Sequence, residues 1–212
     1  EYQITSTIKA TAAASYGQYI FSDNAKLKTN DDALAAAGNN SLTDFGTVYI
    51  KNYHQAGMPQ TAASFGLEYR DPNFWWVGAN VNYLANTYID IASILRTDNF
   101  SIDSSTGDNY SGATPETVKD ILKQEKFDSF TLVNLVGGKS WRISNKNRNT
   151  FGFFASINNI FDVTYKTGGF EQARNANYRE LNQDVSSGTP SFAPKYFYGY
   201  GRTYFVNFYI NL

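Results

Sequence analysis

Residues 74–91, FWWVGANVNYLANTYIDI, alternate between apolar and polar side chains, and this stretch decides the fold. In an extended chain successive side chains point to opposite faces, so residues two apart share a face. One face is almost wholly apolar: Trp75, Val77, Ala79, Val81, Tyr83, Ala85, Thr87, Ile89 and Ile91. The opposite face carries Trp76, Gly78, Asn80, Asn82, Leu84, Asn86, Tyr88 and Asp90. We therefore predict one two-faced strand over the whole stretch, about three times as long as the ~5–6 residues of an average strand.

The same alternation recurs along the chain. A tilted strand of ~9–11 residues crosses a bilayer, with an apolar face toward lipid and a polar face toward the barrel lumen. We therefore expect the odd-numbered residues of 75–91 to face lipid, and Asn80, Asn82 and Asn86 to face the lumen. Further two-faced stretches lie at residues 8–20, 63–70, 130–143, 151–165 and 203–212.

The last of these stretches, TYFVNFYINL, is fully apolar on one face up to its final residue. That face comprises Tyr204, Val206, Phe208, Ile210 and Leu212. Because an unpaired strand edge cannot face lipid, a membrane barrel closes by pairing its last strand with its first. We interpret residues 203–212 as this C-terminal assembly strand, with the apolar face against lipid.

The segments between the two-faced stretches alternate in length. Short turns with Pro, Asp and Asn lie at residues 70–74 and 144–149, whereas residues 27–44, 97–128 and 167–199 are long and polar. Outer-membrane barrels have short periplasmic turns and long extracellular loops. We therefore predict that the long loops gather at one end, opposite the turns.

One long loop contains a helix signal, TPETVKDILKQEKF, at residues 114–127. Thr114 is a suitable N-cap, and Pro115 fits the first helical position. Val118, Ile121 and Leu122 would form an apolar stripe. We predict one short loop helix packed on the rim; a partner-binding helix is the alternative.

Composition narrows the function classes. The 212 residues have a net charge of −1, which gives no electrostatic case for nucleic acid binding. Aromatic residues make up 17% and charged residues 17%, the latter below the ~25% of typical soluble domains. With no Cys and a single His, His54, we expect no zinc site, no cofactor and no enzyme activity. A soluble β protein and a membrane β-barrel remain, and the long strands favour an all-β, membrane-spanning antiparallel barrel.

Two motifs support a family resemblance. SINNIFDVTY, residues 156–165, resembles the penultimate-strand motif of TonB-dependent outer-membrane transporters, and residues 195–212 resemble their last loop and closing strand. Residues 51–70 and 122–141 look like segments of the Bacteroidetes-type branch, Oar-like or SusC-like. The resemblance runs from about Ile4 to Leu212. The family usually ends on an aromatic residue, and here the last residue is Leu212.

The resemblance implies a 22-stranded barrel with an N-terminal plug domain, and active nutrient uptake in a Gram-negative outer membrane. About six to seven strands fit within residues 1–212, fewer than the minimum of about eight for a closed membrane barrel. We therefore expect the chain to be the C-terminal portion of a larger barrel, without the plug. Expected partners are outer-membrane lipid, the remaining barrel and plug, TonB through the N-terminal part, and a surface lipoprotein of the SusD type.

Two other function classes fit the pattern. The first alternative is a non-transporting outer-membrane barrel for surface binding or adhesion. An upstream plug domain would indicate a transporter, and its absence would indicate this alternative. A secreted all-β carbohydrate-binding module is the second, and it would need no detergent.

Several residues are candidates for specific roles. Trp75 and Trp141 flank the short turns, where a girdle of interfacial aromatics is expected, with Lys139 close enough to reach the interface. The loop candidates for contacting a substrate combine aromatic and amide- or guanidinium-bearing side chains. They are Tyr110, Phe170, Arg174, Tyr178 and Arg179.

Other polar residues have a structural reading beside a functional one. Asn158, Asn159 and Asp162 either contact substrate or plug from the lumen, or bond neighbouring backbone where the strand leaves the bilayer. Residues 103–110, DSSTGDNY, loosely resemble a calcium loop but lack its downstream Glu. His54 has no evident second metal ligand, so we expect a surface or rim histidine.

Overall fold

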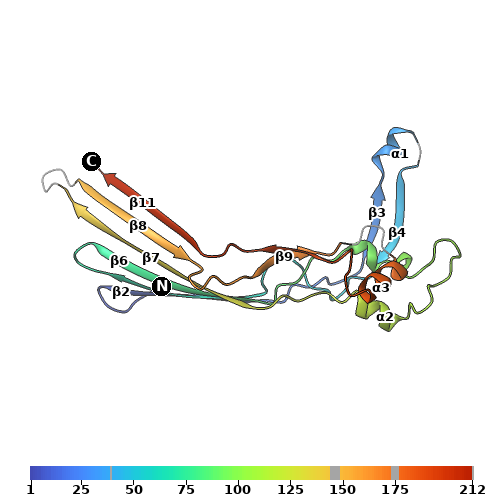
Figure 1. Ribbon diagram of the computed structural model, residues 1–212, viewed down its shortest axis with the longest axis horizontal. Coiled ribbons are helices and arrows are strands. Elements are labelled where there is room, and N and C mark those ends of the chain that lie inside the picture. Colours follow the sequence, from blue (N-terminus) through green and yellow to red (C-terminus); the bar gives the residue numbers. More distant parts are fainter. Residues whose placement is uncertain (39, 144–148, 173–176, 212) are drawn as a thin grey trace.

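A seven-stranded antiparallel sheet dominates the computed structural model, which describes residues 1–38, 40–143, 149–172 and 177–211 (Figure 1). Its strand order is β1-β2-β5-β6-β7-β8-β11. The strands are β1 (Tyr2–Gln3), β2 (Ile8–Tyr16), β5 (Thr61–Arg70), β6 (Trp75–Ala85), β7 (Phe130–Arg142), β8 (Thr150–Asn158) and β11 (Thr203–Asn211). The predicted all-β class and the count of about six to seven sheet strands are confirmed.

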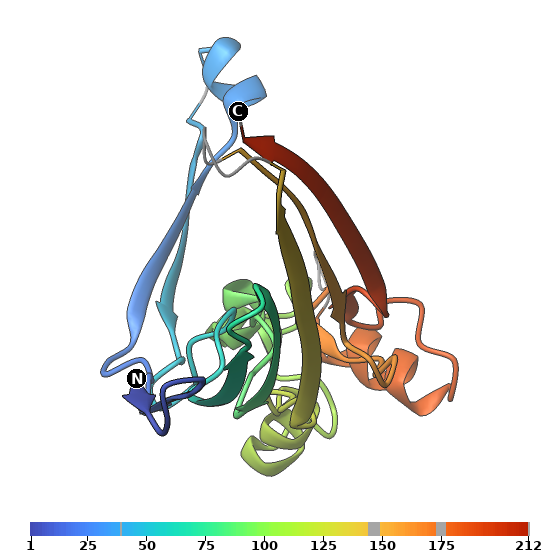
Figure 2. The ribbon, with the colours of Figure 1, turned by 90° about the vertical axis from the view of Figure 1, so that its left-hand side faces the viewer.

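The sheet is an open arc when viewed along its long axis (Figure 2). β11 pairs with β8 along its whole length, from Thr203 opposite Asn158 to Asn211 opposite Thr150. Within the part of the chain that the structure describes, β11 has no other strand neighbour, and it does not reach β2. Among the described residues, the last strand therefore pairs on one side only, with the two-faced stretch at 151–165.

β6 is shorter than the single strand predicted for residues 74–91. It ends at Ala85, because Asn86 adopts a left-handed φ of 59° and its Nδ2 donates to Thr61 Oγ1 at 2.8 Å. The chain then leaves the ladder, and Ile89 is fully buried among the loops, 0% exposed. The prediction that odd-numbered residues face outward as far as Ile91 is therefore wrong beyond Ala85.

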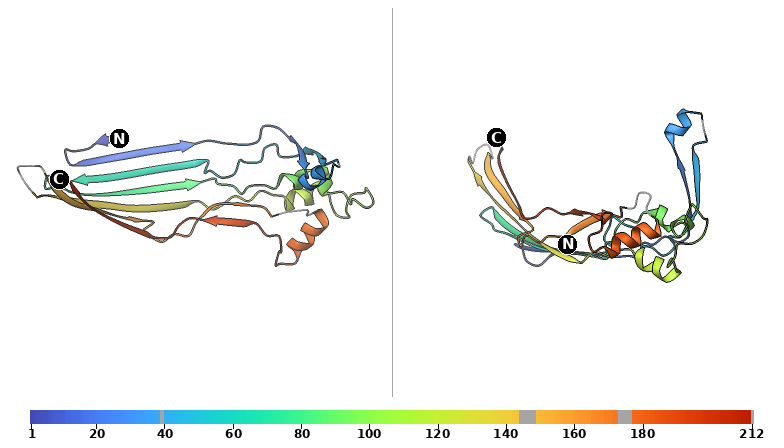
Figure 3. Two further views of the ribbon diagram at one scale, coloured as in Figure 1. Left: turned by 90° about the horizontal axis from the view of Figure 1, so that it is seen from above. Right: turned by 45° about the vertical axis from the view of Figure 1, so that its right-hand side comes forward.

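The long connections gather at one end of the sheet, opposite the turn between β5 and β6, as predicted (Figure 1). The predicted turn at 144–149 lies almost entirely outside the described residues. The loop end contains two hairpins, β3 (Ala25–Asn30) with β4 (Leu42–Val48), and β9 (Lys166–Phe170) with β10 (Lys195–Tyr198). Figure 3 shows the β3–β4 hairpin standing away from the other loops, with α1 (Asp32–Ala36) at its tip.

The predicted loop helix is present as α2 (Pro115–Ile121), with Thr114 as N-cap. Thr114 Oγ1 accepts from the Thr117 backbone N–H, and Thr117 bonds the Thr114 backbone in return, a reciprocal capping box. The expectation of a single loop helix is wrong, since α1 and α3 (Tyr178–Ser186) are also helical, beside the short 3₁₀ turns η1 (Ser93–Arg96) and η2 (Asp98–Phe100). None of the helices in the described ranges is long and apolar enough to cross a membrane.

The buried core lies among the loops and not within the sheet. α2, α3 and the two 3₁₀ turns surround a cluster of Leu95, Phe100, Leu122 and Tyr178, against which Val118 and Ile121 pack. The helix α2 therefore packs its apolar stripe against the chain's own loops, which supports the packed-helix interpretation over a partner-binding one. The sheet leaves large apolar side chains exposed along one face.

Candidate functional surfaces of the sheet and the loops

One face of the sheet, called the polar face, carries asparagine, serine and glutamate side chains beside aromatic ones such as Trp76 and Phe205, and the other, the apolar face, carries mainly apolar side chains. On the polar face, Asn134 Nδ2 donates to Asn80 Oδ1 at 2.9 Å, and Ser64 Oγ donates to Asn82 Oδ1 at 2.8 Å. Glu68, which lies opposite Lys9 of β2 in the strand register, shares this face. Asn80 and Asn82 therefore lie together on the face opposite Val77 and Val81, as the alternation predicted.

The opposite face is continuous across the strands because paired residues share a face. Leu67, Ala79, Leu135, Ile157 and Tyr204 form one such row across five strands. The exposed apolar residues of this apolar face include Tyr2, Tyr16, Phe65, Leu67, Trp75, Val77, Val81, Tyr83, Leu135, Trp141, Phe151, Tyr204, Val206, Phe208 and Ile210. Monomeric soluble proteins rarely expose a contiguous apolar surface of this extent. Leu212, the last predicted member, lies outside the described residues.

Trp75 and Trp141 lie on the apolar face, near the turn end of the sheet. Lys139 pairs with Trp75 in register, and its Nζ lies 5.5 Å from the Trp141 ring centre. Trp75 also packs against Tyr69, and Trp141 against Phe151, with ring centres 5.0 and 5.7 Å apart. This grouping fits the predicted aromatic girdle, whose contact with a membrane interface remains a prediction.

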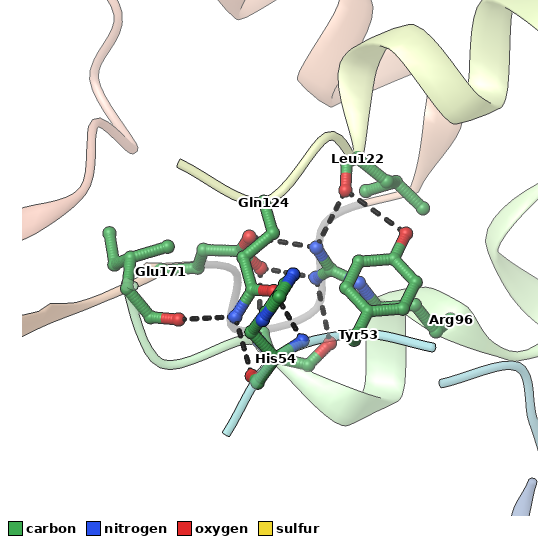
Figure 4. A network of polar contacts seen from close by, with 8 residues as sticks. Tyr53, His54, Arg96, Leu122, Gln124 and Glu171 are labelled. Carbon is green, nitrogen blue, oxygen red and sulfur yellow. Dashed lines mark hydrogen bonds and ion pairs between the residues drawn. The ribbon is translucent and has the colours of Figure 1, made fainter. Parts of the chain in front are cut away.

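A buried ion pair joins the loops where they meet (Figure 4). The Arg96 side chain is 1% exposed and forms a bidentate pair with Glu171, with Nη2 donating to Oε1 at 2.7 Å and Nη1 to Oε2. Nη2 also donates to the carbonyl of Leu122, and the Tyr53 ring centre lies 5.2 Å from the guanidinium carbon. These residues come from η1, the end of α2, the end of β9 and the segment after β4, so the pair holds four loop segments together.

Gln124 and His54 extend this network. The His54 backbone N–H donates to Gln124 Oε1 at 2.8 Å, and Gln124 Nε2 donates to the carbonyls of His54 and Ile89. The imidazole stacks on Tyr88 with ring centres 3.8 Å apart, and Nδ1 lies 3.2 Å from Gln60 Oε1. His54 is therefore a half-buried packing residue at the base of the loops. Across the described ranges, no three His, Cys, Asp or Glu side chains are placed to hold a metal ion together.

A second charged cluster fixes the β9–β10 hairpin. Lys166 Nζ donates to Glu125 Oε1 at 2.7 Å and lies 3.5 Å from the Tyr196 ring centre, while Tyr196 Oη donates to Glu125 Oε2 at 2.6 Å. Burial alone lowers the pKa of Lys166, but the hydrogen bond and charge of Glu125 outweigh it, so the pKa stands above its usual value. Burial, and then the hydrogen bond to Glu125, raise the pKa of Tyr196.

The loop candidates for substrate contact do not form one site. Arg179 lies over the Tyr110 ring, 5.3 Å from its centre, and 4.0 Å from Asp103. Tyr178 is only 4% exposed and its Oη donates to the Gly112 carbonyl, so this side chain serves loop packing. Phe170 is exposed beside Phe197 of β10. Arg174 lies outside the described residues.

The remaining polar candidates bond the chain itself. Asp103 Oδ1 accepts from the Ser105 hydroxyl and backbone N–H, and these bonds lower the pKa of Asp103. The calcium-like loop is thus a hydrogen-bonded turn. Asn159 bonds backbone groups of the turn after β8, and Asp162 Oδ1 accepts from the Arg202 backbone N–H ahead of β11, in line with their structural reading.

The loop end also contains open hollows. One of about 680 Å³ is bordered by Tyr49, Tyr53, Asp98, Asn109 and Lys119. A smaller apolar one, of about 220 Å³, lies between α2, α3 and Glu171, with Leu95, Leu181 and Phe192 in its wall.

Arg96, Glu125, Lys166 and Glu171 were not among the residues singled out from sequence. Of these four, only Arg96 has a local sequence feature that indicates burial: it directly follows the apolar segment IASIL. Its partner lies 75 residues further on. No spacing rule connects the two.

Comparison with known proteins supports the architecture. No family model matches the chain, and no curated protein matches it. Among solved structures, the siderophore receptor PiuA from Acinetobacter baumannii matches with a TM-score of 0.50 at 16% sequence identity. The match covers 98% of this chain and 20% of the receptor, so the chain spans one fifth of that protein's length. At this identity the likeness is one of fold, and together with the open two-faced sheet it shows an all-β antiparallel barrel segment.

Proposed function

We propose that this chain is the C-terminal portion of a TonB-dependent transporter in a Gram-negative outer membrane. The observation that carries the proposal is the open, two-faced sheet with all its long loops at one end. The apolar face would contact lipid, the asparagine-bearing face would line the lumen, and the loop end would face outside the cell. The fold likeness across nearly the whole chain to one fifth of a siderophore receptor supports this proposal.

In the proposed mechanism, the loops bind a nutrient and a plug domain rearranges when TonB pulls on it. The described residues would supply wall, rim and loops, and no catalytic step is assigned to them. A 22-stranded barrel, a Bacteroidetes-type origin and a SusD-type lipoprotein partner belong to the same proposal. The 22-stranded barrel rests on the resemblance of residues 156–165 and 195–212 to the transporter family, and the branch and its lipoprotein partner rest on the resemblance of residues 51–70 and 122–141.

The test uses the full-length protein in its own cells. Strains lacking the protein, lacking TonB, or lacking both are grown in competition on iron-chelated medium and on a panel of glycans and peptides. We expect at least one nutrient on which the three strains lose fitness equally, because both proteins act in one uptake step. Additive losses on every nutrient, or no loss from deleting this protein, would contradict transport.

The alternative of a surface-binding or adhesion barrel keeps the same wall. It predicts a full-length protein that has no plug and that binds its target equally in energised and de-energised cells. The alternative of a secreted carbohydrate-binding module is disfavoured by the exposed apolar face of the sheet. That alternative predicts a monodisperse protein without detergent.

A further inference from the structure

Two short motifs, NNIFD at residues 158–162 and GYGRT at 199–203, are bonded to each other in the structure. Asn159 is 3% exposed and has a left-handed φ of 50°. Its Oδ1 accepts from the Val163 backbone N–H at 2.9 Å, and its Nδ2 donates to the carbonyls of Val163 and Tyr200 at 2.9 and 3.3 Å. One buried side chain therefore shapes the turn after β8 and also binds the segment that leads into β11.

Asp162 and Tyr165 hold the same incoming segment. Asp162 Oδ1 accepts from the Arg202 backbone N–H at 2.7 Å, and the Gly199 N–H donates to the Tyr165 carbonyl at 3.0 Å. A Cβ at Gly201 would lie 2.7 Å from Asp162 Oδ1, and a Cβ at Gly199 would overlap the Tyr165 ring. A side chain at either glycine would displace the Tyr165 ring or the Asp162 carboxylate from its place against the incoming segment.

The turn is itself tied to the rest of the sheet. The Asn159 backbone N–H donates to Asn134 Oδ1 of β7 at 2.8 Å, and Asn134 Nδ2 continues to Asn80 of β6. The Ile160 N–H donates to the Val133 carbonyl at 2.9 Å. The position of residues 199–202 is therefore fixed relative to β6, β7 and β8.

Backbone pairing and the apolar face cannot set the register of β11 alone. A slip by one residue would exchange its two faces, but a slip by two residues keeps every apolar side chain on the apolar face. Where that face meets a uniformly apolar environment, a two-residue slip costs little free energy beyond the backbone hydrogen bonds of the residue pairs lost at the strand ends. Contacts to specific backbone groups at the start of β11 discriminate between these registers.

We propose that Asn159, Asp162, Gly199 and Gly201 form a register lock, which sets the pairing of the last strand with β8. The role is independent of what the barrel carries, so the proposal stands or falls separately from transport. It also assigns the NNIFD motif to assembly of the wall and not to contact with a ligand.

Disulfide trapping in the full-length protein, in outer membranes, tests the lock. Ala155→Cys with Val206→Cys reports the observed register, since the two residues are directly opposite. Ala155→Cys with Tyr204→Cys, and Ala155→Cys with Phe208→Cys, report two-residue slips in either direction. We expect the 155–206 bond to dominate in the otherwise native protein.

Asn159→Ala and Asp162→Ala should each lower the yield of the 155–206 bond at least threefold and raise a slip bond. Asp162→Asn keeps the acceptor for Arg202 and should restore the native yield. Thr164→Ala is the matched control, because Thr164 lies in the same segment as Asp162 and its side chain is exposed. If Asn159→Ala does not fold, Asp162→Ala, which removes a single bond, still provides the readout. Native yields and no slip bond in the folded Ala variants would overturn the proposal.

Discussion

Replacing Glu171 with Gln should loosen the whole loop end. Glu171 Oε2 accepts from the Ala92 backbone N–H at 2.9 Å, and both its oxygens accept from Arg96. Glutamine keeps the shape but directs an amide donor at a guanidinium donor, and it leaves a buried charge without a counter-charge. Breaking a buried pair by removing one partner costs ~3–5 kcal/mol.

The lower end of that range applies here. Arg96 keeps its bonds to the carbonyls of Ala92 and Leu122 and its contact with the Tyr53 ring, and the Glu171 side chain is itself 15% exposed. If the free energy of opening the loops falls by ~3 kcal/mol, amide hydrogens that exchange through this opening should exchange roughly 100-fold faster. The assay is exchange mass spectrometry of the full-length protein in micelles, read on peptides covering residues 92–97 and 121–126.

Glu180→Gln is the matched control, because Glu180 is exposed on α3. It should leave exchange in both peptides unchanged. Replacing the pair together, Arg96→Met with Glu171→Leu, should be less harmful than Glu171→Gln, since no unpaired charge remains buried. The reasoning fails if Glu171→Gln exchanges as slowly as Glu180→Gln.

Three further outcomes are expected. Tyr196 and Lys166 both have raised pKa values, so their stabilisation of the β9–β10 pair is complete below about pH 10 and is lost as the pH rises through those values. Tyr196→Phe should therefore remove one late-ionising tyrosine from an absorbance titration of the protein. Thr114→Ala should cost α2 about 1 kcal/mol by removing its cap, seen as faster exchange within that helix but not in the β-sheet. Gly152→Ala should lower the free energy of unfolding of the full-length protein in urea by ~1–3 kcal/mol, because the new Cβ would lie 2.9 Å from the Lys139 carbonyl and against the Tyr209 ring. Gly168→Ala is the control: its Cβ would make only an ordinary 3.6 Å contact, so the urea midpoint should change little.

The strands were predictable because a two-residue period is a local property of the sequence. The alternation of 74–85 assigned Val77 and Asn80 to their faces correctly. The same alternation continues past Ala85 and misled the prediction, because the left-handed turn at Asn86 depends on a bond to Thr61 of the neighbouring strand. Strand ends are set by such tertiary contacts and not by the pattern.

The loop end was much less predictable. The α2 helix carries its own cap and stripe, so it could be found from residues 114–122 alone. α3 begins at Tyr178, whose ring is buried by residues from distant loops, and its remaining residues are mostly polar. The Arg96–Glu171 pair joins residues far apart in sequence, and only the folded chain brings them together.

The central claim is that the sheet separates lipid from a polar lumen, and labels on β6 test it most directly. Single cysteines replace Val77, Val81, Asn80 and Asn82 in the full-length protein, and each carries an environment-sensitive fluorophore in lipid vesicles. We predict that labels at 77 and 81 are quenched by nitroxide lipids, whereas labels at 80 and 82 are not and respond to aqueous iodide. Lipid quenching at 80 and 82, or iodide quenching of all four labels with none from nitroxide lipids, would contradict the account.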